Sequence, residues 1–370
     1  MCVKLFKEDL QFLYDELNKH SSIKINPLIS NRLKELFETL INEVIDYKSF
    51  INSMTTLTNF FNDGHTNIEL PYTLDDKCLN IPCIWDNDRL ITNDNTEILA
   101  IENMSIEKII ELMADKIPHE NKYLVMSRMI NYPYKNYHIF SKMNLEYLFG
   151  SKDYYDVTLL IDDKLITKHY CLENYNGYLD FKDDKDFISY EMINDSVILH
   201  LDSCIYNDEY KNTLKYLVNY CNDNNIKSFI LDLSKNMGGS SAVIDEFIKY
   251  VSVDEYRRYE MVKYSDDEVC YITKREDVIK NQKSEKCFNC DIYCKVSYDT
   301  FSSARTFAVT LKDNNIAKII GQPTGGKPNS FGMPNKYATP NYNIRFRVSS
   351  SYFLRPDSSK DDLVSLFPDE

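Results

Sequence analysis

The sequence lacks the features that mark several large protein classes. No apolar run is long enough to cross a bilayer, and the first residues carry Lys, Glu and Asp where a secretion signal needs an apolar core. No basic patch is present, and the formal net charge of −14 disfavours nucleic acid and anionic membrane surfaces as main partners. We therefore expect a cytoplasmic protein that spans no membrane and binds no nucleic acid.

The ten cysteines lack the pattern of a disulfide framework, and without a leader they are expected to be free thiols. In the stretch "CFNCDIYC", Cys287, Cys290 and Cys294 begin with a metal-like spacing. A zinc site needs four ligands, however, and no second Cys or His pair lies nearby in sequence. Cys294 also falls in a predicted strand, where alternation makes it a packing residue. We expect no metal and no organic cofactor.

Hydrophobic residues make up 43% of the 370 residues, which is enough for two or three packed units. The predicted fold class is α/β, with a mixed strand-helix core, an N-terminal helical lobe and a small inserted α+β domain. The predicted division places the helical lobe in residues 1–70, the inserted region in 71–187 and the α/β core in 188–370.

The N-terminal lobe shows apolar residues at helical spacing from Phe6 to Phe61, with breaks expected at residues 21–30 and at Ser53. The stretch "NDGHTNIEL" then predicts a turn and a short strand. In the inserted region, "EILAIENMSIEKIIELM" reads as a strand and a helix, and "DVTLLIDDKLITKHYCL" as a hairpin with an Asp-Asp turn.

From Ile188 onward, predicted strands and helices alternate. The strands are "SVILHLDS", "IKSFILDLS", "YCKVSYD" and "IAKIIGQ", and the intervening helices include "SAVIDEFIKYVS" and "SARTFAVTLKDN". Such alternation predicts parallel pairing, with a crevice at the strand ends where active sites usually lie.

Two strand-to-helix junctions in this core carry unusual residues, although the chain has only nine glycines. "LDLSKNMGGSS" places Gly238 and Gly239 after a strand, and "DTFSSAR" places Ser302 and Ser303 at another junction. Bare backbone N–H groups beside a hydroxyl nucleophile suit acyl transfer, because they stabilise a tetrahedral oxyanion. Taken from spacing alone, a tight turn and two helix-capping serines are the favoured explanation of the same residues, because serines often begin helices.

Four stretches in this order resemble the landmarks of the C-terminal processing (tail-specific) and tricorn-type serine peptidases. They are "NDGHTNIEL", "FILDLSKNMGGSS", "YDTFSSARTFAVTLKDNNIAKIIGQPTGGKPNSFG" and "LFPD". The resemblance covers the helical lobe and the core, and it is weakest between Pro71 and Lys185. It implies crotonase-like ββα layers in the core and a serine endopeptidase that acts on peptide or unfolded protein segments.

The resemblance assigns the nucleophile to Ser302 and the oxyanion hole to the backbone N–H of Gly238 or Gly239 with that of Ser303. Two bases remain open. Lys327 has the spacing of the tail-specific branch, whereas His65 matches the tricorn-like branch and starts nearer a suitable pKa, so we prefer it. The supporting acid is also open, and its candidates are Asp361, Asp362 and Asp313.

The sequence departs from the family at Arg305, which stands where the family usually has Glu and so reverses a charge one turn from the nucleophile. A catalytically degenerate relative that binds peptides without cleaving them is therefore the alternative. The inserted region reads as a degenerate peptide-binding (PDZ-like) domain or as a lid, and a homo-oligomer stays open.

Overall fold

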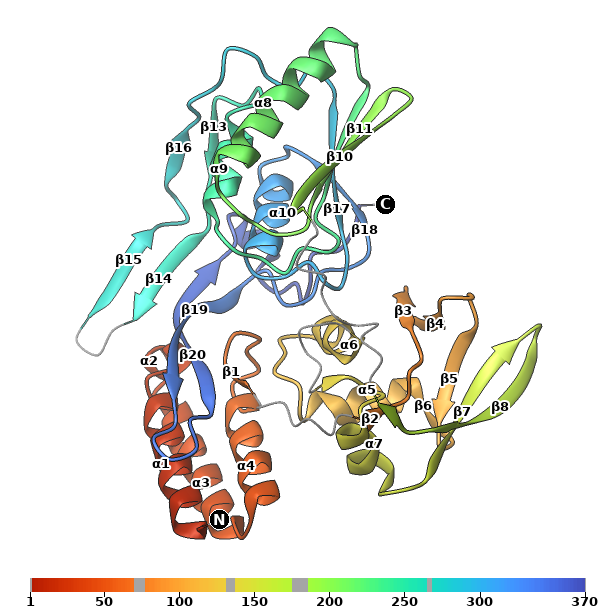
Figure 1. Ribbon diagram of the computed structural model, residues 1–370. Coiled ribbons are helices and arrows are strands. Elements are labelled where there is room, and N and C mark those ends of the chain that lie inside the picture. The colour runs from red at the N-terminus through yellow and green to blue at the C-terminus, as the bar shows by residue number, and fades with distance from the viewer. Residues whose placement is uncertain (1, 70–76, 131–136, 175–185, 265–267, 370) are drawn as a thin grey trace. The chain divides into compact units, whose positions relative to one another are not determined.

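The computed structural model describes residues 2–69, 77–130, 137–174, 186–264 and 268–369 (Figure 1). Two compact units make up the chain. Unit 1 comprises Met1–Asp183 and Pro334–Val348, and unit 2 comprises Asp184–Met333 and Ser349–Glu370. The predicted fold class, mixed α/β, is confirmed. The crotonase-like layering and the three-part division stay predictions.

Unit 1 begins with a helical bundle, as the spacing of apolar residues predicts. Its helices are α1 (Val3–Leu17), α2 (Ser21–Ile25), α3 (Leu28–Glu43) and α4 (Tyr47–Asn59). One apolar stripe from each long helix enters a common core that includes Phe6, Leu33 and Phe50.

The break expected at Ser53 was wrong, because α4 runs through it. Ser53 is 3% exposed and lies on the buried face of the helix, between Phe50 and Leu57. The helix begins instead at Asp46, whose side chain accepts a hydrogen bond from the N–H of Ser49 at 2.7 Å.

The rest of unit 1 is a mixture of short strands and helices. The strands are β1 (Asn67–Glu69), β2 (Lys77–Cys78), β3 (Cys83–Asp86), β4 (Arg89–Thr92), β5 (Glu97–Ile101), β6 (Met104–Ser105), β7 (Tyr154–Ile161), β8 (Lys164–Cys171) and β9 (Glu173–Asn174). The helices are α5 (Ile106–Ala114), α6 (Lys122–Ile130) and α7 (Lys142–Phe149). The predicted hairpin is confirmed: β7 and β8 pair antiparallel around Asp162 and Asp163, whose φ angles of 48° and 59° fit a tight hairpin turn.

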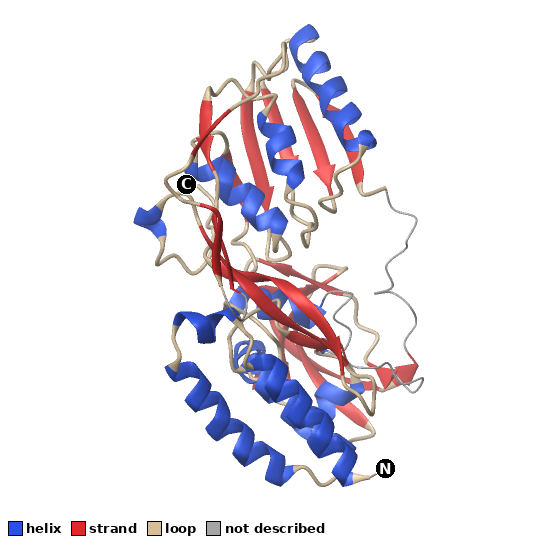
Figure 2. Ribbon diagram, turned by 90° about the vertical axis from the view of Figure 1, so that its left-hand side faces the viewer, coloured by secondary structure: helices blue, strands red, loops and turns tan. Residues whose placement is uncertain are grey.

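Unit 2 contains a five-stranded sheet in the order β10-β11-β12-β17-β18. Its strands are β10 (Ile188–Ile193), β11 (Ser196–Leu201), β12 (Ser228–Asp232), β17 (Asp291–Val296) and β18 (Lys318–Gly321). β10 and β11 pair antiparallel, and the other neighbours pair parallel. Figure 2 shows helices lying across the face of this sheet that is turned to the viewer.

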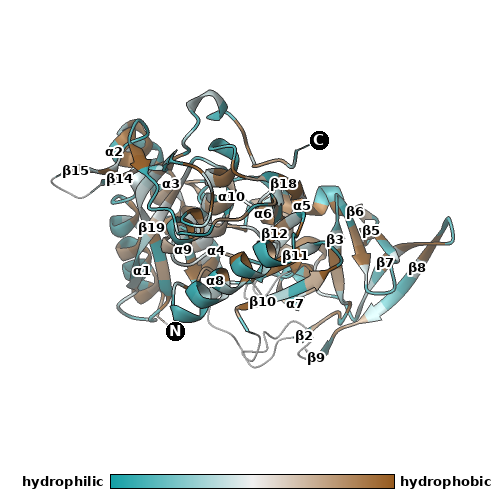
Figure 3. Ribbon diagram, turned by 90° about the horizontal axis from the view of Figure 1, so that it is seen from above, coloured by the Kyte–Doolittle hydropathy of each residue, from teal (hydrophilic) through white to brown (hydrophobic). Residues whose placement is uncertain are grey.

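The helices of unit 2 are the crossovers of this parallel sheet, as the alternation predicts. They are α8 (Asp208–Asp223), α9 (Ala242–Ile248) and α10 (Ser303–Asp313). α8 carries both hydrophilic and hydrophobic residues (Figure 3), and its apolar side packs in the core with Leu199, Phe229 and Phe307. Cys294 is fully buried in the same core, which confirms its predicted packing role.

Besides β10, six strands among the described residues after β12 were missed from the sequence. They are β13 (Glu255–Arg257), β14 (Glu260–Tyr264), β15 (Val269–Thr273), β16 (Val278–Lys280), β19 (Ser330–Ala338) and β20 (Arg345–Leu354). β20 passes from unit 1, where it pairs with β1, to unit 2, where it pairs with β14. Over the described ranges, every helix is too short or too polar to span a bilayer.

Candidate functional site

The two junctions singled out in the sequence lie beside each other in unit 2. β12 and β17 are adjacent parallel strands, with Asp232 opposite Lys295 near their carboxyl ends. The Gly238 turn follows β12 and the Ser302 turn follows β17, so both turns emerge at the same edge of the sheet. Lys295 also donates a hydrogen bond to Asp232 at 3.1 Å, which ties the two strand ends together.

Ser302 occupies a strained backbone position immediately before α10. Its φ of 53° and ψ of −127° are unusual for a residue with a side chain, and its hydroxyl makes no helix-capping hydrogen bond. Such strain costs about 1–3 kcal/mol and persists where the surrounding structure holds it, often at active sites. A serine on a sharp strand-to-helix turn presents its Oγ at the sheet edge, in the manner of a nucleophile elbow.

Gly238 packs directly against this serine. A Cβ built on Gly238 would lie 2.6 Å from the Cβ of Ser302 and 3.1 Å from its Oγ. The φ of Gly238, 111°, is also one that L residues rarely adopt. Glycine is therefore required here for two reasons, the close approach to Ser302 and the backbone conformation.

Of the two glycines, Gly239 has the backbone groups that face the start of α10. It forms a parallel bridge with Cys204 that uses the C=O of Gly238 and the N–H of Ser240. The N–H and C=O of Gly239 itself therefore face the opposite side. That carbonyl accepts a hydrogen bond from the Oγ of Ser303 at 2.7 Å, so this side faces the start of α10.

Asn236 fixes the Gly238 turn and was missed from the sequence. It is fully buried, its Nδ2 donates to the carbonyl of Leu201 at 2.7 Å, and its Oδ1 accepts from the N–H of Gly238 at 2.8 Å. Its own carbonyl accepts from the N–H of Phe301 at 3.1 Å. The N–H of Gly238 is thus engaged by Asn236.

Arg305 and Lys327 have contrasting environments in unit 2. Arg305 is 2% exposed, its Nη2 donates to the Oγ of Ser330, and its guanidinium lies 5.3 Å from the centre of the Phe301 ring. The positive charge of Arg305, which stands where the family usually has Glu, is thus buried next to the Ser302 turn. Lys327 is exposed, whereas a lysine base needs burial to lose its proton near neutral pH.

The three acids predicted from the sequence lie in different surroundings in unit 2. Asp313 is fully buried against Arg355, with hydrogen bonds of 3.0 and 2.6 Å, at the far end of α10, roughly 16 Å along the helix from Ser302. Asp361 accepts two bonds from Arg275 and one from Asn329.

Burial raises the pKa of Asp361, but the hydrogen bonds from Arg275 and Asn329 lower this pKa by a larger amount, so the net shift is downward. Asp362 is exposed. The two best-held carboxylates of the three, Asp313 and Asp361, thus already balance the charge of an arginine.

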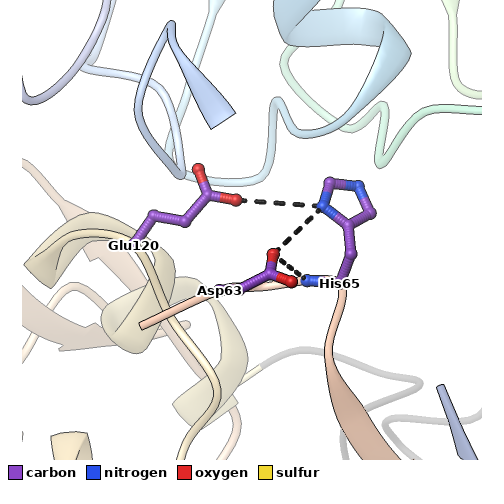
Figure 4. A group of neighbouring side chains, drawn as sticks. All are labelled: Asp63, His65 and Glu120. Atoms are coloured by element: carbon purple, nitrogen blue, oxygen red, sulfur yellow. Dashed lines mark hydrogen bonds and ion pairs between the residues drawn. The ribbon is translucent and has the colours of Figure 1, made fainter. Parts of the chain in front are cut away.

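His65 lies in unit 1 between two carboxylates, as Figure 4 shows. Its Nδ1 is 3.7 Å from the Oδ1 of Asp63 and 3.8 Å from the Oε1 of Glu120. The imidazole is 14% exposed, while the carboxylates of Asp63 and Glu120 are 0% and 3% exposed. Both acids face the same ring nitrogen, and Nε2 lies on the other side of the ring (Figure 4).

Asp63 organises the turn that carries His65. Its Oδ1 accepts from the N–H of His65 at 2.9 Å, and its Oδ2 accepts from Thr66 at 2.6 Å and faces Nε2 of His20 at 3.2 Å. Burial raises the pKa of Asp63, but the hydrogen bonds and charges of His20 and His65 lower it well below its usual range. Asp63 is therefore ionised at neutral pH.

Arg128 joins the turn to the segment that carries Glu120. Its side chain is buried, its Nη2 donates to the carbonyl of Gly64 at 2.8 Å, and its Nη1 donates to the carbonyl of Pro118. One guanidinium thus fixes the backbone immediately before His65 and two residues before Glu120. Nothing in the local sequence around Glu120 signals this arrangement, because the contact is tertiary.

The same three side chains could hold a cation. Among the described residues, Asp63, His65 and Glu120 are the one group of this kind, with ligand atoms all within 4.8 Å of one another. Imidazole nitrogen and carboxylate oxygen are ordinary Zn²⁺ ligands, and three protein ligands leave one position open. The sequence search for metal ligands considered cysteines and could not find this group.

The chain was compared with known proteins by sequence family and by structure. Residues 195–360 match the model of Peptidase family S41. The structure of mature CPAF complexed with lactacystin has a TM-score of 0.69 at 12% identity, over 99% of this chain and 93% of that one.

Two other solved structures are similar over nearly the whole chain. A photosystem II D1 C-terminal processing protease has a TM-score of 0.52 at 9% identity, over 98% and 92% of the two chains. A putative peptidase from Parabacteroides merdae has a TM-score of 0.54 at 13% identity, over 98% and 88%. At these identities the structures show a shared fold. No curated protein matches the sequence.

Proposed function

We propose that this chain is a serine-type peptidase of family S41, whose model matches residues 195–360, and that it cleaves extended peptide or protein segments through an acyl-enzyme formed on Ser302. The observation that carries this assignment is the strained Ser302 turn, packed against Gly238 and followed by the N-terminus of α10. Because Gly238 has no side chain, it leaves room for a substrate carbonyl beside the hydroxyl of Ser302. The N-terminus of α10 suits binding of the oxyanion that forms when this hydroxyl attacks the carbonyl.

The proposed reaction has two halves. The Oγ of Ser302 attacks the peptide carbonyl while His65 takes its proton, and the tetrahedral oxyanion accepts hydrogen bonds from the N–H groups of Gly239 and Ser303. Collapse breaks the C–N bond, and His65 returns the proton to the leaving amine. Water then hydrolyses the ester by the same steps and regenerates Ser302.

His65 is the proposed base, and Lys327 stays the alternative. His65 is shielded and flanked by carboxylates, whereas Lys327 is exposed. Gly238 contributes chiefly through its lack of a side chain. Asp361, Asp362 and Asp313 stay candidates for the supporting acid.

Peptide and protein substrates follow from the family. We also propose that the inserted region 71–187 is a substrate-binding domain or a lid. A homo-oligomer stays an open option. We further propose that the protein is cytoplasmic and has no nucleic-acid partner. β8 supports strand addition as a binding mode, because it is the end strand of its sheet and seven of its eight residues are exposed.

A fluorophosphonate probe tests the nucleophile. We expect the folded wild type to be labelled and Ser302→Ala to lose labelling, while the matched control Ser241→Ala, an exposed serine at the start of α9 without a capping bond, keeps it. Loss in His65→Ala with retention in Lys327→Ala identifies His65 as the base.

The opposite result is equally informative. Labelling that persists in Ser302→Ala overturns the assignment of the nucleophile. A folded wild type that is not labelled, and that binds an unfolded protein such as reduced casein without cleaving it, supports the degenerate, peptide-binding alternative.

A further inference from the structure

We infer that Glu120, supplied by the inserted region, is the positioning residue that holds the imidazole of His65 ready to accept a proton at Nε2. This inference rests on the proposed function, since it assigns an acid to the proposed base. It departs from the three acids expected near the C-terminus and at the end of α10. Its support is the arrangement of Glu120, Asp63 and Arg128 within unit 1.

The first argument is the direction of the ring. Both Glu120 and Asp63 face Nδ1, at 3.8 and 3.7 Å, and Nε2 lies on the far side of the ring (Figure 4). A carboxylate beside Nδ1 favours the tautomer with the proton on that nitrogen, which leaves the lone pair of Nε2 for the nucleophile's proton.

The second argument is that Asp63 and Glu120 have different roles. Asp63 accepts hydrogen bonds from the N–H of His65 and the hydroxyl of Thr66, and it faces His20. These contacts fix the backbone of the turn. Glu120 reaches the same imidazole nitrogen from a separate segment, with a longer side chain, and is suited to orient the ring itself.

The third argument is the way the two segments are joined. Arg128 donates to the carbonyls of Gly64 and Pro118, so a buried guanidinium sets the spacing between the His65 turn and the Glu120 segment. A residue that orients a catalytic group must itself be held by its surroundings. The inserted region meets that requirement with Arg128.

The fourth argument is charge. When His65 accepts the proton of Ser302, the ring becomes an imidazolium, and two buried carboxylates stabilise it. By contrast, Asp361 and Asp313 are each bonded to an arginine, Arg275 and Arg355, which already balances their charge.

The test combines kinetics with the state of the ring. We expect Glu120→Gln to lower kcat for a peptide substrate by roughly 10- to 100-fold with little change in KM, and Glu120→Asp to recover part of it. A purely structural role would not give this separation of kcat from KM.

The matched control is Glu111→Gln, which removes an exposed glutamate of α5 in the same region. We expect its kcat and KM to equal those of the wild type. If Glu120→Gln behaves like this control while Ser302→Ala is inactive, the inference is overturned and the proposed function stands.

A spectroscopic measurement on the wild type needs neither turnover nor a substitution at Glu120. In ¹⁵N NMR of histidine-labelled protein, with the signals of His65 identified by their loss in His65→Ala, we expect Nδ1 of His65 to carry the proton in the neutral ring. A neutral His65 protonated mainly at Nε2 overturns the inference. Failure of the nucleophile assignment would appear instead as labelling that persists in Ser302→Ala.

Discussion

The turn that carries Ser302 in unit 2 and the turn that carries His65 in unit 1 are held by different kinds of interaction. Around Ser302 the constraint comes from the backbone: a positive φ, two glycines and a bridge to Cys204. Around His65 it comes from buried side chains, among them Asp63 and Arg128. The first turn should therefore be sensitive to added atoms, and the second to lost charges and hydrogen bonds.

The largest expected effect is at Gly238. Because a Cβ there would lie 2.6 Å from that of Ser302, Gly238→Ala should displace the nucleophile and lower kcat/KM by more than about 100-fold. Gly150→Ala is the control, since its φ is also positive but no atom lies within 4 Å of the added Cβ. Steady-state kinetics on both variants measures the difference. Equal activities would mean that the Ser302 turn is not held by close packing.

The next effect concerns the charge at Asp63. Asp63→Asn leaves buried donors without their ionised acceptor and should lower the free energy of unfolding by about 3 kcal/mol at pH 7. The folded-state pKa of Asp63 lies well below 3.8, so its contribution is complete above the unfolded value and is lost as pH falls through the folded one.

Urea unfolding between pH 7 and pH 2 checks both parts of this prediction. The stability difference between wild type and Asp63→Asn should shrink as the pH falls below about 4. A difference that stays constant over that range would mean that the ionised carboxylate does not stabilise the turn.

These two turns also show how much of the candidate site could be predicted from the sequence. The Ser302 and Gly238 junctions were predicted because each carries local signals, a strand, small residues and a helix, and because parallel strands bring their carboxyl ends together. The contribution of Glu120 could not be predicted, because its position beside His65 depends on contacts of Arg128 with backbone far away in sequence. The roles assigned to Ser302, His65, Lys327 and the oxyanion donors stay predictions.

The fold shows the same limit. Strands β11, β12, β17 and β18 of the main sheet and its crossover helices were predicted from apolar periodicity and are confirmed, whereas β10 was missed. Strands β13 to β16 were missed because charged residues, as in "EYRRYEMVKYSDDEVCYITKRED", hide the alternation of exposed strands. Ser53 was read as a break because serine often ends helices, whereas its neighbours continue the buried stripe.

A smaller effect is expected at Asn236, which links the Gly238 turn to β11. Asn236→Ala removes its bonds to Leu201 and Gly238 and should lower stability by about 2 kcal/mol and kcat by roughly 10-fold. Asn236→Asp keeps the acceptor for Gly238 but loses the donor to Leu201, so the two variants separate the two bonds. Thermal unfolding and kinetics measure them. An unchanged kcat in both would show that the turn is held by its glycines alone.

The smallest effect is expected at Asp361. If Glu120 orients His65, Asp361→Asn should weaken the contact with Arg275 and change kcat by no more than about threefold. Comparing the kcat of this variant with that of Glu120→Gln shows which of the two acids contributes more to catalysis. A loss of 100-fold or more in Asp361→Asn, with unfolding unchanged, would favour the acid predicted from the sequence.

The sequence by itself determined the α/β class and the alternation of strands β11, β12, β17 and β18 with helices in the main sheet. These follow from periodicity and short motifs, which are local properties. Tertiary structure alone decided which groups surround His65, which N–H of the glycine pair faces the start of α10, and where the charge of Arg305 is buried. The physical reason is that burial, pairing and direction arise only when distant segments pack, and no local pattern encodes them.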